Sequence, residues 1–193
     1  MSRLLFSLGL AFCLLVTMSC SGSLFKVKPA ADLPPLPANS RSTEAGGVTV
    51  RVAPLLTDER SQELFEANLP LAGVLPVRVE LIFQNGATVE MKKVKFRLRD
   101  SQNREWKLLS SRKAVSRIMS ANGVTLYNPN SKKQFESEFG AYAFDLKTPL
   151  TASESHRQGF LFFQSPEKKA VTSDQQLTLT VERLPQTASI AIN

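Results

Sequence analysis

The sequence predicts a mainly β fold, an antiparallel β-sandwich with one or two short helical insertions, preceded by an export segment. From Val48 onward, apolar residues mostly recur at every second position, which is typical of half-buried strands. These short runs are separated by turn-forming residues, and strand patterns do not alternate with helix patterns as a βαβ fold requires. Residues 48–193 are enough for one domain with its own apolar core.

The first 19 residues predict a lipoprotein signal peptide. A cationic start at Arg3 precedes the apolar run Leu4–Val16, which is too short to span a bilayer and typical of a secretory signal. Cys20 follows the small residue Ser19 and resembles the acylated cysteine of a bacterial lipobox, which implies a lipid anchor such as palmitate. Thr17 stands where a lipobox usually has leucine, so an ordinary secretory signal cut after Ser19 is the alternative.

Residues 20–47 are predicted to be the lipidated cysteine followed by a Pro/Ser-rich tether. Prolines and a Gly-Gly pair interrupt this stretch, and no apolar periodicity remains in it. Signal removal takes Cys13 away, and a lipid on Cys20 leaves the mature domain without a free thiol. We therefore expect neither a disulfide nor a cysteine-ligated metal, and the β domain 48–193 must be stabilised by its apolar core.

Period-two patterns place the strands. We expect them at 48–52, 75–83, 94–98, 106–108, 142–146, 160–163 and 177–181, with 190–192 as a last strand or a disordered tail. Asn85-Gly86 is a strong turn signal because both residues tolerate positive φ, and it predicts a hairpin that joins 75–83 to 94–98. Phe162 and Phe163 point to opposite sides of their strand, so we expect a sheet to cover one and the helix 111–121 the other.

Two short helices are expected between the strands. The first spans Asp58–Asn68. The second spans Ser111–Ala121, with a capping serine at its start and the stop signal Asn122-Gly123 after its end. Residues 126–134 read as a loop with a turn at Asn128-Pro129-Asn130.

Two segments resemble the immunoglobulin-like domains of Gram-negative lipoproteins. One is Val77–Leu98, which leads into Phe96-Arg97-Leu98-Arg99-Asp100. The other is Leu150–Phe163, where a polar turn leads to Gly159 and an aromatic strand. The resemblance covers residues 77–184, implies an immunoglobulin-like β-sandwich of undefined function, and carries over no site residue. The chain departs from the pattern in lacking Pro-Gly at the turn and in the helical insertion at 111–121.

Positive charge is concentrated in one stretch. The whole chain has a net charge of +7. Ten basic residues and two acidic ones lie between Lys92 and Arg117, a net of +8, so the rest of the mature chain is slightly acidic.

A strand at 94–98 would gather part of this charge on the face opposite its apolar residues. The candidate binding residues are Lys93, Lys95, Arg97 and Arg99 on the strand, with Arg112, Lys113 and Arg117 on the helix. Such a surface attracts acidic partners, and near an anionic bilayer each cation contributes about 1 kcal/mol. The alternative is a solvated strand face that deters aggregation. Nucleic acid matches the charge but not the exported compartment, and no recognition motif accompanies it.

An enzyme is the least favoured interpretation. His156 is the single histidine and lies in the polar stretch 153–157, where a solvated role is favoured over a nucleophile–base pair. Glu136 and Glu138 would share a face if their segment were a strand, and such a pair is usually solvated. No catalytic residue, metal ligand or cofactor is predicted, and no phosphate loop or nucleophile elbow is present in the sequence.

The sequence thus predicts a non-catalytic binding or accessory module of the cell envelope, anchored to the membrane through Cys20, with the periplasmic side of the outer membrane as its location. Its expected partner is an envelope protein or an anionic glycan or lipid that meets the basic strand face. The alternatives are a structural subunit that docks through apolar surface and, least favoured, a hydrolase.

Overall fold

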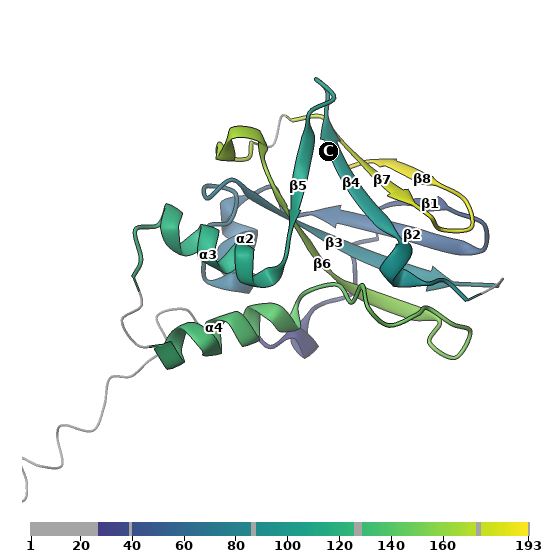
Figure 1. The fold of residues 1–193 in the computed structure, drawn as a ribbon, viewed down its shortest axis with the longest axis horizontal. Helices are drawn as coiled ribbons and strands as arrows, with labels where there is room; N and C mark the ends of the chain where they lie inside the picture. Colours follow the sequence, from purple (N-terminus) through teal and green to yellow (C-terminus); the bar gives the residue numbers. More distant parts are fainter. Residues whose placement is uncertain (1–26, 39, 86–87, 126–128, 173–174, 193) are drawn as a thin grey trace, which may run out of the picture.

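Eight antiparallel strands form one continuous sheet in the part of the chain that the structure, a computed structural model, describes. That part comprises residues 27–192 without 39, 86–87, 126–128 and 173–174. The strand order is β1-β2-β3-β6-β5-β4-β7-β8, and β1 lies against β8, so the sheet curves into a nearly barrel-shaped body (Figure 1). The strands are β1 Arg41–Glu44, β2 Val48–Pro54, β3 Val74–Phe83, β4 Lys95–Asp100, β5 Glu105–Leu109, β6 His156–Gln164, β7 Leu177–Glu182 and β8 Ala188–Ala191. The mainly β, antiparallel prediction is confirmed, whereas an immunoglobulin-like sandwich is not.

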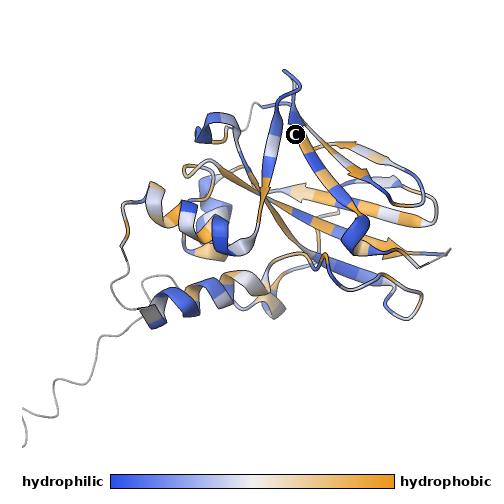
Figure 2. Ribbon diagram, in the orientation of Figure 1, coloured by the Kyte–Doolittle hydropathy of each residue, from blue (hydrophilic) through white to orange (hydrophobic). Residues whose placement is uncertain are grey.

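The alternation seen in the sequence fills the interior of this sheet. Val50 of β2 pairs with Leu81 of β3, and both are fully buried together with the other inward-facing residues of their strands. On the opposite side, Leu98 of β4 pairs with Leu179 of β7, and Trp106 of β5 pairs with Leu98. Figure 2 shows the hydrophilic and hydrophobic residues alternating along β4. This apolar interior is the main core of the domain.

Three helices cover the outer face of β3 and β6 and form a second core. They are α2 Asp58–Phe65, α3 Ser111–Ala121 and α4 Pro129–Ala141. Phe162 of β6 packs on Phe139 of α4 with ring centroids 4.6 Å apart, while Phe163 lies in the interior of the sheet. Both phenylalanines are therefore covered, as expected, although α4 contributes to the cover beside α3.

The helix 111–121 has the predicted bounds and caps. Ser110 Oγ accepts a hydrogen bond from Lys113 N at 3.4 Å, and the chain leaves the helix through Gly123 at φ +63°. The apolar side of α3 is buried, with Val115 and Ile118 fully so. Helix α2 ends three residues earlier than predicted, because Glu66 adopts the left-handed conformation.

The predicted hairpin between 75–83 and 94–98 is wrong. β3 pairs with β2 and β6, and β4 pairs with β5 and β7. Val74–Phe83 is buried on both faces, so it needs a central place with a neighbour on each side. The chain after β3 instead crosses to β4 through the 3-10 turn η2, Met91–Lys93. Gly86 lies outside the described residues.

Two further expectations between 126 and 146 are wrong. Within the predicted loop 126–134, the chain from Pro129 onward is helix α4, because Phe135 and Phe139 recur four residues apart and bury one helical face. Residues 126–128 lie outside the described part. The predicted strand 142–146 is reduced to a single parallel bridge, Ala143 with Phe160.

The domain begins earlier than residue 48. Of the predicted tether, residues 27–38 lie on the sheet and on α2: Lys28 N donates to Leu64 O at 3.2 Å, and Leu36 is buried. This segment contains the 3-10 turn η1, Ala30–Asp32, and is followed by β1, which pairs with β2. We call residues 27–38 the strap. Its prolines carry no periodicity, so its packing was not visible in the sequence.

The signal peptide and Cys20 lie outside the described residues. Among the helices in the described part of the chain, none is both long and apolar enough to cross a bilayer.

Candidate binding groove

The sheet opens on one side, where β4 and β5 separate. These strands pair only through Leu98 with Trp106 and Arg99 with Glu105. The end of β5 then turns to β6, where Leu108 pairs with Phe163. The opening that this leaves between β4, β5 and β6 is partly filled by residues 143–150, the connection from α4 to β6.

Two features hold this connection against β6. Phe144 N donates to Phe160 O at 2.9 Å, and Phe160 N donates to Tyr142 O at 2.6 Å. The backbone approaches so closely because Gly159 has no side chain: a Cβ there would lie 2.5 Å from Phe144 Cα. Arg157, which points inward and is buried, donates to the carbonyls of the connection at Asp145, Thr148 and Pro149.

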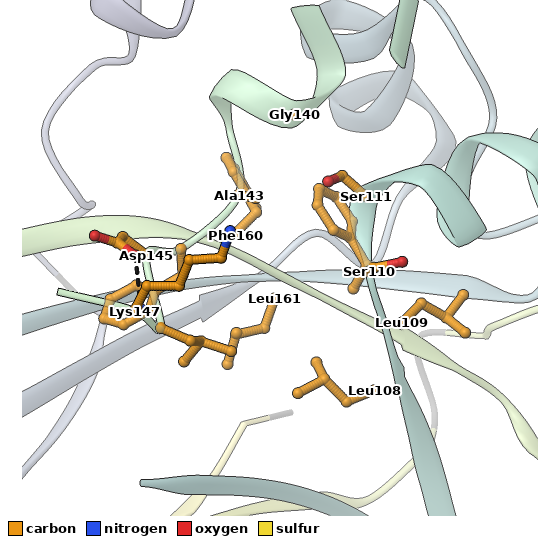
Figure 3. A pocket seen from close by; sticks show the side chains of 13 residues that line it. Leu108, Leu109, Ser110, Ser111, Gly140, Ala143, Asp145, Lys147, Phe160 and Leu161 are labelled. Carbon is orange, nitrogen blue, oxygen red and sulfur yellow. Dashed lines mark hydrogen bonds between the residues drawn. The ribbon is translucent and has the colours of Figure 1, made fainter. Parts of the chain in front are cut away.

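A cavity of about 630 Å³ lies between the end of β5 and this connection (Figure 3). Its walls are mainly apolar and are formed by Leu108, Leu109, Ala143, Phe144, Leu146, Phe160, Leu161 and Phe162. Ser110 and Ser111, at the start of α3, line one side of it, and Asp145 and Lys147 line another. In Figure 3 the Lys147 side chain extends across the cavity toward Ala143.

A smaller cavity of about 280 Å³ adjoins the first. Leu108 and Leu146 line both cavities, and both residues are only half-buried. The smaller cavity is also lined by Val94, Lys95, Phe96, Arg97 and Glu105 of β4, β5 and the approach to β4. We call the two cavities together the β4–β5 groove. It connects an apolar pocket to the basic face that the sequence singled out.

Charged groups stand at both ends of the groove. Lys147 lies at one end, beside Asp145, whose pKa is lowered by hydrogen bonds from the Thr148 hydroxyl and the Lys147 amide. Lys95 and Arg97 line the other end. The pKa of Arg97 is raised, first by its close contact with the Glu182 carboxylate and then by the charge of Glu105.

The predicted basic strand face carries negative as well as positive charges. Lys95, Arg97 and Arg99 lie on the outer face of β4, as expected, whereas Lys93 belongs to the turn η2. Arg97 makes ion pairs of 3.0 Å with both Glu105 and Glu182, from β5 and β7. The like-charge field expected along this strand is therefore reduced by two carboxylates from the neighbouring strands.

The helical cations are not brought to this strand. Arg112, Lys113 and Arg117 lie on α3, which packs against α4, β3 and β5. Arg112 is 3.6 Å from Glu136, and Arg117 donates to Lys168 O at 3.1 Å. In the view of Figure 1, β5 lies between α3 and β4.

The residues weighed for catalysis are held by structural partners. His156 begins β6 and its Nε2 lies 2.6 Å from Glu80 Oε1, while Arg51 donates to the other oxygen of Glu80 at 2.5 Å. The sequence did not single out Glu80 or Arg51. Glu136 and Glu138 would share a face only on a strand, and their segment is helix α4, where residues two apart point in different directions. Within the described residues, no group of three or more potential metal ligands is found.

Sequence reasoning missed Lys147 and the pocket-lining role of Leu108 and Leu146. The two leucines were read as ordinary strand residues, and only their half-buried state beside an opened strand pair reveals them. Searches of protein-family models, curated proteins and solved structures gave no match to this chain.

Proposed function

We propose that this protein is a non-catalytic binding module of the bacterial cell envelope, and that its β4–β5 groove binds an anionic amphiphile. The ligand class is a single acyl chain that ends in a carboxylate or phosphate. The observation that carries the proposal is the apolar opening between β4 and β5, with Lys147 at one end and Lys95 at the other.

The acyl chain accounts for the apolar part of the groove. Leucine and phenylalanine side chains line it, and each methylene buried there contributes about 0.8 kcal/mol. A volume of about 630 Å³ for the larger cavity is within the range of small-molecule sites.

The cations account for the anionic end of the ligand. Arg97 is already engaged by two carboxylates, so Lys95 is the better candidate at the β4 end. Lys147 is exposed at the other end, and the start of α3, where backbone N–H groups favour an anion, lines another side of the larger cavity. A head group at either end keeps contact with water while the chain is buried.

The location belongs to the same proposal. The predicted signal peptide, the predicted acylation of Cys20 and the resemblance to immunoglobulin-like lipoproteins all favour the periplasmic side of the outer membrane. A lipid-anchored domain at a membrane surface is close to acyl ligands. Residues 20–26 would then connect the anchor to the strap.

A second candidate is an acidic partner, a protein or glycan, that meets the outer face of β4 directly. Lys95 and Arg99 are exposed on that face, Lys107 is exposed on the neighbouring strand β5, and none of the helices α2, α3 and α4 covers them. This candidate differs in its salt dependence, because an interface of exposed charges weakens steeply with ionic strength whereas acyl-chain burial does not. For docking through apolar surface, the described part of the chain offers one exposed large apolar side chain, Leu71.

The test uses the mature chain with Cys20→Ser, which removes the anchor, and a fluorescent long-chain fatty acid as the probe. Leu146→Asp places a charge in the apolar part of the groove and is expected to weaken binding at least tenfold. Leu71→Asp is the matched control, since it makes the same change at an exposed leucine elsewhere. Lys147→Glu is expected to weaken the fatty acid more than its uncharged alcohol. Equal binding by wild type and Leu146→Asp, both folded, would contradict the proposal.

A further inference from the structure

Arg78 is a buried cation with an unused hydrogen-bond donor. It lies on the outer face of β3, between Ala53 of β2 and Phe160 of β6, and only 5% of its surface is exposed. Its Nη2 donates to Gln158 Oε1 at 2.6 Å. Its Nε is buried and has no hydrogen-bond partner among the described residues.

A buried cation with an unpaired hydrogen-bond donor lowers the stability of the fold unless a partner balances its charge. Buried guanidinium groups are normally paired and fully hydrogen-bonded. Burial lowers the pKa of Arg78, and the charge of Glu80 only partly offsets this. Glu80 itself is occupied by Arg51 and His156, at 2.5 and 2.6 Å. A further charge partner for Arg78 therefore has to come from outside this cluster.

A cavity of about 440 Å³ borders Arg78 and is closed on one side by the strap. Its apolar lining comes from the strap prolines, β2 and its continuation, α2 and β6, namely Pro34, Pro35, Pro37, Ala53, Pro54, Leu55, Leu64 and Phe160. The strap is fixed to α2 by the ion pair of Lys28 with Glu63, at 3.1 Å.

The charged residues that line the cavity favour a ligand with a single negative charge. Lys28, Arg60 and Arg78 are the cations of the cavity, and Asp32 and Glu63 are its carboxylates, a net of +1. Because Lys28 and Glu63 neutralise each other, the uncompensated charge belongs to Arg78, Arg60 and Asp32. A ligand with one negative charge balances the net charge of the cavity lining, whereas a phosphate dianion would leave the site with a net negative charge.

We infer that this cavity is a second binding site, distinct from the β4–β5 groove, for a small organic carboxylate. The carboxylate pairs with the guanidinium of Arg78, with Arg60 as the second cation. The apolar part of the molecule lies against Leu64, Phe160 and the strap prolines. The strap forms one wall of this pocket, so its role goes beyond connecting the domain to the lipid anchor.

The experiment is fluorine NMR on the purified full mature chain, with 4-fluorobenzoate as the probe and 4-fluorobenzamide as its uncharged analogue. Broadening of the benzoate signal is expected, with little for the amide. Arg78→Met is expected to weaken the benzoate at least tenfold, and Arg78→Lys to restore part of the binding. Arg183→Met, which removes an exposed arginine that follows β7, is the matched control and is expected to bind normally.

A second variant guards against a folding defect. Leu64→Trp leaves Arg78 in place but fills the cavity, and it is also expected to abolish benzoate binding. Benzoate that does not bind to wild type, binds equally to Arg78→Met or Leu64→Trp, or is matched by the amide would overturn the inference. Fatty-acid binding in the β4–β5 groove is expected to be unchanged in Arg78→Met, so failure here and failure of the proposed function can be told apart.

Discussion

Replacement of Gly159 by alanine tests how the connection from α4 to β6 is held. An alanine Cβ would lie 2.5 Å from Phe144 Cα, 2.7 Å from Phe144 N and 3.0 Å from the Ala143 carbonyl carbon. All three are backbone atoms, so no side-chain rotation relieves the clash. The connection has to move away from β6.

The expected cost follows from what that movement breaks. Two backbone hydrogen bonds join Tyr142 and Phe144 to Phe160, and each contributes about 1 kcal/mol. Overpacking in a core adds about 1–3 kcal/mol. Phe144 also loses its edge contact with Phe96, whose ring centroid is 5.7 Å away. We expect Gly159→Ala to lower the free energy of unfolding by about 3–5 kcal/mol.

Urea denaturation followed by circular dichroism measures this change. Gly140→Ala is the matched control, because a Cβ at Gly140 meets nothing closer than Ser111 Oγ at 3.8 Å. In helix α4 that alanine is expected to stabilise by roughly 0.5–1 kcal/mol. A Gly159→Ala protein within about 0.5 kcal/mol of wild type would refute the close approach of these two backbones.

Three further changes have defined outcomes. Tyr142→Phe is expected to raise the free energy of unfolding by about 1 kcal/mol, because the buried Tyr142 hydroxyl has no partner among the described residues; an unchanged or lower melting temperature would contradict this. Arg157→Leu removes a buried guanidinium that donates to three carbonyls of the connection, and it is expected to cost about 3 kcal/mol in urea denaturation, whereas an unchanged midpoint would show that the connection is held otherwise. Asp100→Asn is expected to destabilise the protein at pH 7. Burial raises the pKa of Asp100, but hydrogen bonds and charge from Arg104, with the Gln102 amide, bring it below its usual range. The stability from a carboxyl with a lowered folded pKa is present above its unfolded pKa of about 3.9 and is lost as pH falls through the folded value. The gap between Asp100→Asn and wild type should therefore close in acid, and a gap that persists at low pH would contradict this.

Capping residues and period-two patterns predicted the helices and strands whose formation depends mainly on neighbouring residues in the sequence. Helix α3 follows from the cap at Ser110 and the stop at Asn122-Gly123, and the strands β2, β4 and β7 follow from period-two patterns. Helix α4 was not predicted because the turn signal Asn128-Pro129-Asn130 indicates a loop, although Phe135 and Phe139 stand one helical turn apart. Two apolar residues four positions apart fit both the period of a helix and that of a strand, so such a short segment does not decide between them.

Strand neighbours and the groove depend on long-range contacts. Nothing near Asn85 shows that β3 must pair with β6, whose residues lie far along the chain. The basic residues of β4 were found, but their neutralisation by Glu105 and Glu182 comes from two other strands. The pocket beside Leu146 exists because two strands separate, which no sequence pattern encodes.

Photo-crosslinking with a fatty acid that carries a diazirine at the end of its chain tests the central claim most directly. The mature Cys20→Ser chain is irradiated with the probe, and the labelled residues are identified by mass spectrometry. The proposal predicts labels on the lining of the β4–β5 groove, at Leu108, Phe144 or Leu146, which excess unlabelled fatty acid removes. Labels spread over other surfaces such as Leu71, or no competed label in the groove, would contradict it.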